Sequence, residues 1–197
     1  MKIRMDHIDK AYDDQQVFAD FSLELEGDGV FAILGESGCG KTTLLRLIAG
    51  LEKPDQGTIF GVPSHIRMVF QENRLCEELN VQENLLLTME KGASRSLVSE
   101  HLKQIGLFGV EKKPVKELSG GMKRRVAILR AIIAGGQLLI MDEPFVNMDE
   151  ETKRTAMEYV KEKRGQRPML LVTHDTTEAD FFHAQRIYID KEENASL

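Results

Sequence analysis

The sequence predicts an α/β domain with a largely parallel core sheet and a helical segment inserted into it. Short apolar runs bounded by turn residues alternate with stretches in which apolar residues recur at helical spacing. Continuous apolar runs are typical of strands that are covered on both faces, as the strands of parallel sheets are. The chain has 197 residues, of which 42% are hydrophobic, and this suits one domain with a core of its own.

Five apolar runs are predicted to be strands. The run at 30–35 lies between the turn sequence EGDG and a glycine-rich loop, and the other four are 65–71, 137–143, 168–175 and 186–190. Helical spacing predicts helices at 41–50, 123–134, 150–164 and 176–183. Between about residues 76 and 134 the pattern changes, because 81–92 and 94–107 are helical and no strong strand pattern separates them. We therefore expect a single domain, 1–197, with a helical subdomain at about 76–134.

Composition restricts the classes of function. The formal net charge is −6 and no long basic run is present, which argues against nonspecific binding to nucleic acid. Cys39 and Cys76 are far apart and form no CxxC pair, so neither a disulfide framework nor a zinc site is expected, and a reducing cytosol fits. The sequence shows no signal peptide and no apolar run that could span a bilayer. We expect any role at a membrane to depend on a partner protein.

The stretch GESGCGKTT, residues 35–43, fits the pattern G-x-x-x-x-G-K-[ST] between a predicted strand and a predicted helix, which is the context of a P-loop. Glycines let successive backbone N–H groups face a phosphate, and the helix adds its positive dipole end. Lys41 is expected to bind the β and γ phosphates, and the Thr42 hydroxyl to bind Mg²⁺. The predicted nucleotide-binding residues are Gly35, Glu36, Ser37, Gly38, Cys39, Gly40, Lys41, Thr42 and Thr43, with no separate role for Cys39.

Two further strands end in polar residues. Asp142 and Glu143 follow the apolar run LLIM, at the carboxyl end of a strand, where α/β sheets place ligands. Asp142 is predicted to hold Mg²⁺ through water and Glu143 to be the general base for the attacking water. An acidic pair that caps the next turn is the structural alternative, and a neighbouring P-loop favours the catalytic one. His174 leaves another strand end and is predicted to contact the γ phosphate, against the alternative of a structural histidine.

The stretch LSGGMKRR, residues 118–125, narrows the choice among P-loop proteins, which include kinases, GTPases and helicases. It follows the helical segment, precedes LLIMDEP, and resembles the signature motif of ABC ATPases. Other elements of that family are present in order: Tyr12 before the P-loop, Gln71 at a strand end after it, then Asp149 and His174. The resemblance covers about residues 2–190 and implies a RecA-like core, an N-terminal antiparallel β portion and the helical subdomain.

The resemblance also implies roles for individual residues. In this family two ATPase domains pack head to tail, and each ATP lies between the P-loop of one and the signature of the other. Ser119, Gly120 and Gly121 would offer a hydroxyl and N–H groups at a helix start to the phosphates of the second subunit's ATP. Tyr12 would stack on adenine, with a half-buried strand tyrosine as the alternative. Gln71 would touch the Mg²⁺ and water region, residues 72–79 would meet a membrane partner, and Asp149 would lie at the dimer interface.

We expect an ATP-hydrolysing subunit of an ABC transporter, with ATP and Mg²⁺ as cofactors. Its expected partners are a second ATPase subunit, identical or a close paralogue, a transmembrane permease and a solute-binding protein, and no nucleic acid. It would lie at the cytoplasmic face of the membrane, held there by the permease. Met122 in the signature and the stretch FQENRL resemble importers of the nitrate, taurine and alkanesulfonate type.

The sequence leaves three alternatives open. One is an ABC ATPase that moves no solute and acts in cell-envelope remodelling. A small-molecule P-loop kinase would leave LSGG unexplained. A protein that only binds ATP is disfavoured by the intact residues Lys41, Asp142, Glu143 and His174. The sequence departs from the family pattern at Met122, where glutamine is usual, and at Asn147, where serine is common.

Overall fold

The computed structural model describes residues 1–13, 15–89 and 95–190, and the chain divides into two compact units. We call Met1–Met68, Gln137–Asp142 and Gln166–Leu197 the sheet unit, and Val69–Gly136 with Glu143–Gly165 the helical unit. Among the described residues no helix is both long enough and apolar enough to cross a membrane.

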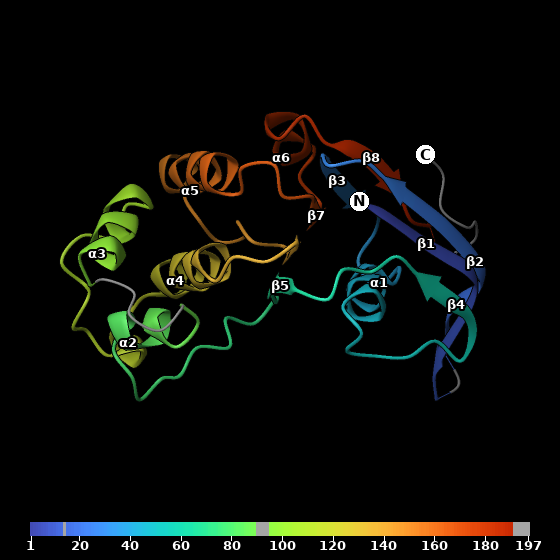
Figure 1. The fold of residues 1–197 in the computed structure, drawn as a ribbon, viewed down its shortest axis with the longest axis horizontal. Coiled ribbons are helices and arrows are strands. Elements are labelled where there is room, and N and C mark those ends of the chain that lie inside the picture. Colours follow the sequence, from blue (N-terminus) through green and yellow to red (C-terminus); the bar gives the residue numbers. More distant parts are fainter. Residues whose placement is uncertain (14, 90–94, 191–197) are drawn as a thin grey trace. The chain divides into compact units, whose positions relative to one another are not determined.

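The main sheet of the sheet unit has five strands in the order β5-β6-β7-β3-β8 (Figure 1). Its pairs β6–β7, β7–β3 and β3–β8 are parallel, which confirms the predicted sheet. All side chains of β3, β6 and β7 are buried, as expected for strands covered on both faces. The five strands are β3 Val30–Leu34, β5 Ile66–Val69, β6 Leu138–Asp142, β7 Met169–Val172 and β8 Gln185–Tyr188.

A second, three-stranded sheet has the order β2-β1-β4, with β1 Lys2–Tyr12, β2 Gln15–Glu26 and β4 Gln56–Phe60. Both of its pairs are antiparallel, so the antiparallel portion that the family resemblance implied is confirmed. Its buried side chains form one core with the apolar side of α1 Lys41–Ile48 and with the main sheet. The sheet unit also contains α6 Thr176–Phe181.

The helical unit contains α2 Val81–Leu86, α3 Arg95–Gln104, a 3₁₀ turn at Val115–Glu117, α4 Gly120–Ile133 and α5 Glu150–Lys163 (Figure 1). The segment predicted as helical at about 76–134 lies within this unit, which also takes in α5. Of the two helices predicted there, residues 90–92 of the first and residue 94 of the second lie outside the described residues. Helix α4 begins three residues earlier than the predicted 123, because Ser119 Oγ accepts a hydrogen bond from the Met122 N–H and caps it.

Candidate functional site

The register of the main sheet brings three predicted sites to one edge of the sheet unit. Ile33 of β3 and Asp142 of β6 both pair with Val172 of β7. The P-loop after β3, the Asp142 carboxylate and the turn that carries His174 therefore lie at the carboxyl ends of three neighbouring parallel strands. This is the edge at which α/β sheets bind ligands.

The backbone of the P-loop requires glycine for two different reasons. A Cβ on Gly35 would lie 2.3 Å from the Ile189 carbonyl oxygen, and one on Gly40 would lie 2.8 Å from Val17 Cγ1. Gly38 has open space around it, but its φ of +79° is one that other residues rarely adopt. Close packing fixes both ends of the loop, while Glu36, Ser37 and Gly38 between them are exposed. The loop thus keeps a fixed shape and leaves its outer rim open to a phosphate chain.

Lys41 is buried, with 7% of its surface exposed. Its ammonium donates to the carbonyl oxygens of Gly35 at 2.8 Å and Glu36 at 2.7 Å, and lies 3.8 Å from Cys39 Sγ. The charge is therefore held inside the curve of the loop, where phosphates would need it. The contact with Cys39 is one that the sequence pattern does not indicate.

Thr42 and Asp142 are 100 positions apart in sequence but hydrogen-bonded in the structure, with Thr42 Oγ1 donating to Asp142 Oδ2 at 2.9 Å. Asp142 is 2% exposed, so its carboxylate is fixed by the strand end. A hydroxyl and a carboxylate oxygen are the hard donors that Mg²⁺ takes in proteins, so these residues fit that ion. Gln71, the third predicted ligand, belongs to the helical unit.

His174 is exposed in the turn between β7 and α6. Hydrogen bonds on either side hold this turn: the Asp175 N–H donates to Thr173 Oγ1 at 3.0 Å, and Asp175 Oδ1 accepts from the Thr177 N–H at 2.8 Å. The second bond caps α6. The histidine therefore sits on a fixed turn at the same sheet edge as the P-loop.

Tyr12 ends β1 with 39% of its surface exposed. Its hydroxyl donates to Glu52 Oε2, and Arg46 Nη1 donates to Glu52 Oε1 at 3.3 Å. Lys10 Nζ lies 5.2 Å from the centroid of the tyrosine ring. The ring is thus held at its hydroxyl end and still partly open to solvent. Glu52 and Arg46 carry no sequence signal that would have linked them to Tyr12.

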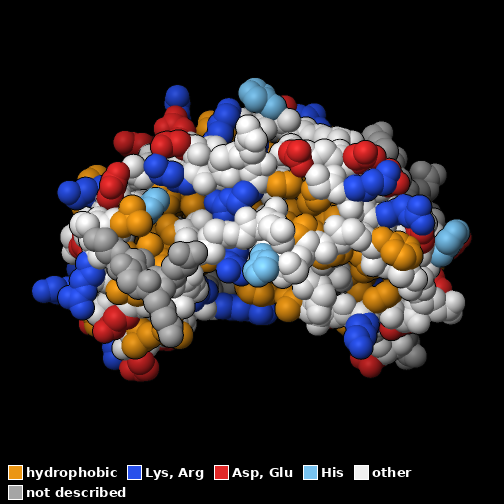
Figure 2. Space-filling model, viewed as in Figure 1, with side chains coloured by type: hydrophobic (Ala, Val, Ile, Leu, Met, Phe, Trp, Pro, Cys, Tyr) orange, Lys and Arg blue, Asp and Glu red, His pale blue; other side chains and the backbone are white. Residues whose placement is uncertain are grey.

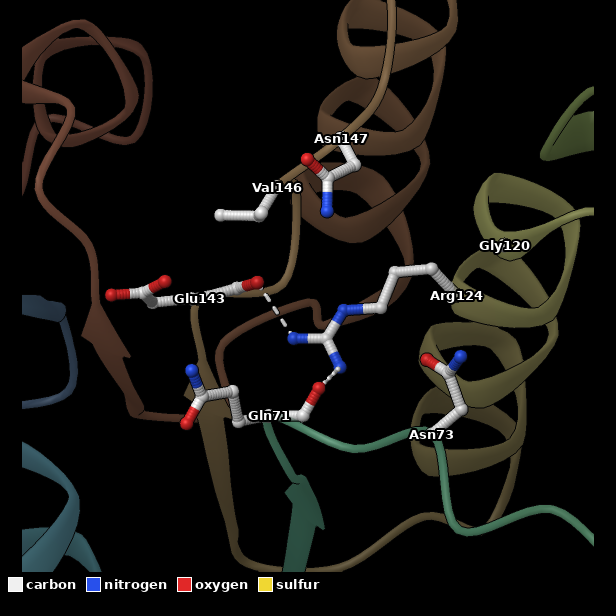
Figure 3. A pocket seen from close by; sticks show the side chains of 7 residues that line it. All are labelled: Gln71, Asn73, Gly120, Arg124, Glu143, Val146 and Asn147. Carbon is white, nitrogen blue, oxygen red and sulfur yellow. Dashed lines mark hydrogen bonds between the residues drawn. The ribbon is translucent and has the colours of Figure 1, made fainter.

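In the helical unit, a cavity of about 250 Å³ brings Gln71 and Glu143 together with the signature residue Gly120 (Figure 3). Glu143 has φ +45° and Asn147 has φ +60°, a left-handed conformation that asparagine tolerates better than most residues. This gives a backbone reason for asparagine at 147 where the family commonly has serine. The lining residues are Gln71, Asn73, Gly120, Arg124, Glu143, Val146 and Asn147.

Arg124 is the residue of this cavity that sequence reasoning missed. It is 5% exposed, and its guanidinium donates to backbone carbonyl oxygens of the segment after β5 and of the segment after β6. The sequence does contain a signal for Arg124. This residue lies three and four positions before Ala127 and Ile128, and this spacing places all three residues on the same, buried side of α4. A charged residue on the apolar face of a helix is informative, since it is rarely buried without partners.

The signature residues lie at the start of α4, where Ser119 is the N-cap. A Cβ on Gly120 would meet nothing within 4 Å, and one on Gly121 would meet only the Asn147 carbonyl oxygen at 3.8 Å. Packing within the chain therefore does not require glycine at either position.

Asp149 is the N-cap of α5, and its Oδ1 accepts a hydrogen bond from the Thr152 N–H at 2.9 Å. The backbone and side-chain hydrogen bonds from Thr152 lower the pKa of the Asp149 carboxyl, and Arg125 adds to the effect. This is a structural role that sequence reasoning did not assign to Asp149. Its predicted place at a dimer interface stays a prediction.

The predicted site residues thus form two groups. Tyr12, the loop 35–43, Asp142 and His174 belong to the sheet unit, and Gln71, the signature, Glu143 and Asp149 belong to the helical unit. The chain passes from the first group to the second between Asp142 and Glu143.

Comparison with known proteins gives a family match. The family model described as ABC transporter matches residues 18–146. The chain is 38% identical over 181 residues to the aliphatic sulfonates import ATP-binding protein SsuB 2 of Pseudomonas syringae pv. tomato, covering 91% of this chain and 77% of that protein. It is 37% identical over 194 residues to the spermidine/putrescine import ATP-binding protein PotA of Acetivibrio thermocellus, covering 90% of this chain and 55% of that protein.

Two solved structures share the fold. The ATP-binding cassette MJ0796, a dimer in a post-hydrolysis state bound to ADP and Pi, superposes with a TM-score of 0.84 at 24% identity, covering 98% of this chain and 97% of that one. A bacterial Atm1-family ABC exporter with ATP bound superposes with a TM-score of 0.87 at 22% identity, covering 99% of this chain and 38% of that one.

Proposed function

The chain belongs to the ABC transporter family, as one of its ATP-binding and ATP-hydrolysing subunits, and on this premise we propose that two such subunits close around two ATP molecules and part again after hydrolysis. The observation that carries the proposal is the open backbone of the signature. Glycine loses more conformational freedom on folding than any other residue, yet Gly120 and Gly121 meet no packing demand in their own chain. A phosphate chain that approaches from a second subunit supplies the reason for both glycines.

The start of α4 is suited to that phosphate chain. Its 14 residues give it a helix dipole, and its first turn contains no acidic residue. Ser119 and Gly120 are both exposed, so the hydroxyl and the first N–H groups can be reached from outside. These residues would bind the phosphates only weakly by themselves. We expect tight binding only when the P-loop of the other subunit holds the opposite side of the phosphate chain.

Within each subunit the roles follow from position. Lys41 would bind the β and γ phosphates, and Thr42 with Asp142 and Gln71 would hold Mg²⁺, which when bound offsets the phosphate charge. Glu143 would take a proton from the attacking water as its oxygen bonds to the γ phosphorus, while the bond from that phosphorus to the bridging oxygen breaks. His174 would contact the γ phosphate, and Tyr12 would stack on adenine. The products are ADP and inorganic phosphate.

The subunit would serve a solute importer through a permease and a solute-binding protein, at the cytoplasmic face of the membrane. Two relatives named as import ATP-binding proteins support the direction of transport. They are named for different solutes at 38% and 37% identity, so identity does not select the solute. Over the helical unit, the face drawn in Figure 2 shows acidic and basic side chains with hydrophobic ones between them. Leu87, Leu97 and Phe108 of this unit are exposed and suit contact with a partner.

The test is the Glu143→Gln variant in size-exclusion chromatography, with and without Mg-ATP. The change removes the base and keeps the side chain's shape, so ATP should stay bound and the protein should elute as a dimer only with nucleotide. Adding Gly120→Glu should abolish the dimer without unfolding the chain, since the site is open. Gly29→Glu is the matched control, because a Cβ there also meets nothing within 4 Å. A Glu143→Gln protein that binds ATP tightly and stays monomeric, or a dimer that persists after Gly120→Glu is added, would contradict the proposal.

A further inference from the structure

One guanidinium group joins the two segments of the helical unit that carry Gln71 and Glu143. Nη1 of Arg124 donates to the carbonyl oxygen of Phe70 and, at 3.1 Å, to that of Gln71. Nη2 donates to the Glu143 carbonyl oxygen at 2.6 Å, and Nε to that of Pro144 at 3.0 Å. Four carbonyl oxygens thus accept from a planar group whose five N–H bonds have a fixed geometry.

The second segment has a backbone that needs such support. Glu143 has φ +45°, a conformation that non-glycine residues keep only where the surroundings hold it. The Arg124 bonds fix the carbonyl of Glu143 and the next one in the chain, Pro144. The Glu143 carbonyl lies in the peptide plane that directly follows the Glu143 Cα, so holding this carbonyl holds that plane and restricts the direction in which the Glu143 side chain leaves the backbone.

Figure 3 shows what this arrangement does to the side chains. The backbone carbonyls of Gln71 and Glu143 face the guanidinium, while the Gln71 amide and the Glu143 carboxylate extend away from it on the same side. Arg124 therefore contacts neither functional group directly. It holds the backbone positions from which the Gln71 and Glu143 side chains extend.

We propose that Arg124 is the positioning residue that holds the general base Glu143 and the phosphate-sensing residue Gln71 in register with each other. Because one rigid group binds both segments, a displacement of residues 70–71 is passed to residues 143–144. The inference rests on the proposed role of Glu143 in hydrolysis. It adds that the base is aimed from helix α4, directly after the signature.

The experiment compares Arg124→Met, which keeps an aliphatic stem and removes every N–H donor, with Arg124→Lys. We expect Arg124→Met to lower kcat by on the order of 10²-fold, as misplacement of a catalytic group does, while the Kd for ATP stays unchanged because the P-loop belongs to the other unit. A lysine ammonium can donate to these carbonyls as a point charge but lacks the planar fork. The kcat of Arg124→Lys should therefore lie between those of the wild type and Arg124→Met.

Arg130→Met is the matched control. Arg130 is on the same helix, is half-buried, and donates from Nη2 to the carbonyl oxygen of Arg74 at 2.8 Å. It ties down the same segment after β5, but it is not one of the groups that bind the Glu143 backbone. Its kcat should stay close to that of the wild type, even if its melting temperature falls as that of Arg124→Met does.

Combining each Arg124 variant with Glu143→Gln separates positioning from general stabilisation. If Arg124 acts through Glu143 and Gln71, adding an Arg124 substitution to Glu143→Gln should slow single-turnover hydrolysis by less than the same substitution slows the wild type. A full multiplicative loss, or an unchanged kcat in both Arg124 variants, would overturn the inference. If Arg124→Met does not fold, the same comparison is made with Arg124→Lys, alone and combined with Glu143→Gln. Failure of the proposed function gives a different result, in which Glu143→Gln hydrolyses ATP as fast as the wild type.

Discussion

Replacing Gly35 with alanine tests whether close packing, and not only backbone conformation, fixes the P-loop. The new Cβ would lie 2.3 Å from the Ile189 carbonyl oxygen and 2.8 Å from Cys39 Sγ, whereas ordinary contacts are 3.4–4 Å. The oxygen belongs to a backbone held by the bond from the Ile189 N–H to the Leu34 carbonyl at 2.9 Å. The end of β3 and the segment after β8 must therefore separate by about 1 Å, a strain that typical overpacking data place at about 1–3 kcal/mol.

Gly38→Ala is the control, because Gly38 shares the loop and a positive φ but has nothing within 4 Å. Both variants carry the conformational strain of about 1–3 kcal/mol, so their difference isolates the clash. For a chain of this size that difference corresponds to roughly 5 °C in Tm. Thermal unfolding followed by circular dichroism measures it. Equal melting temperatures for the two variants would refute the packing argument and leave φ as the sole reason for glycine at position 35.

Two further predictions concern adenine binding and pH. Tyr12→Ala and Glu52→Ala should each weaken ATP binding about 5-fold, since an aromatic stacking pair contributes about 1 kcal/mol. Binding of inorganic triphosphate, which has no adenine, should stay unchanged in both variants. Calorimetry measures both affinities, and equal losses for ATP and triphosphate would count against stacking. Burial, with Lys163 adding to it, lowers the pKa of His101 below its ordinary value of 6.5, while Glu100 and Glu162 act in the opposite direction. The unfolded chain then binds this proton more readily than the folded one, so stability is complete above pH 6.5 and falls as the pH drops below it. Urea unfolding between pH 7.5 and 5 should show a shallower loss for His101→Phe, and an equal loss would contradict the assignment.

The buried strands could be predicted because their side chains face apolar surroundings on both sides. The runs around β3, β6 and β7 are continuously apolar for that reason. The antiparallel sheet was harder to recognise, and only the family resemblance implied it. Its strand β1 has a left-handed residue, His7, and register shifts against β2 between Met5 and Lys10. Such irregularities break the alternation that marks a half-buried strand.

The candidate site likewise has residues that could be predicted from the sequence and residues that could not. The P-loop could be located from the sequence because each residue type in it answers a local demand, and Asp142 because it ends an apolar strand. The contacts that position side chains across the chain have no such local signature. Glu52 beneath the Tyr12 hydroxyl is 40 positions from it, and Arg124 is 53 positions from Gln71. Those contacts depend on how the fold brings distant segments together, which no local stretch of sequence encodes.

Asp142 and Glu143 show why adjacent residues in one motif need different supports. Asp142 is the last residue of β6, where pairing with β7 and the bond from Thr42 fix its carboxylate. Glu143 is outside the strand, and its φ of +45° turns the backbone away from the strand direction. The sheet therefore cannot aim the Glu143 side chain, although it places the Asp142 side chain one residue earlier. The carbonyl bonds from Arg124 supply that aim from helix α4. If Asp142 holds Mg²⁺ and Glu143 is the base, as proposed, a ligand that must stay fixed and a base that must adjust have a physical reason to be anchored on different units.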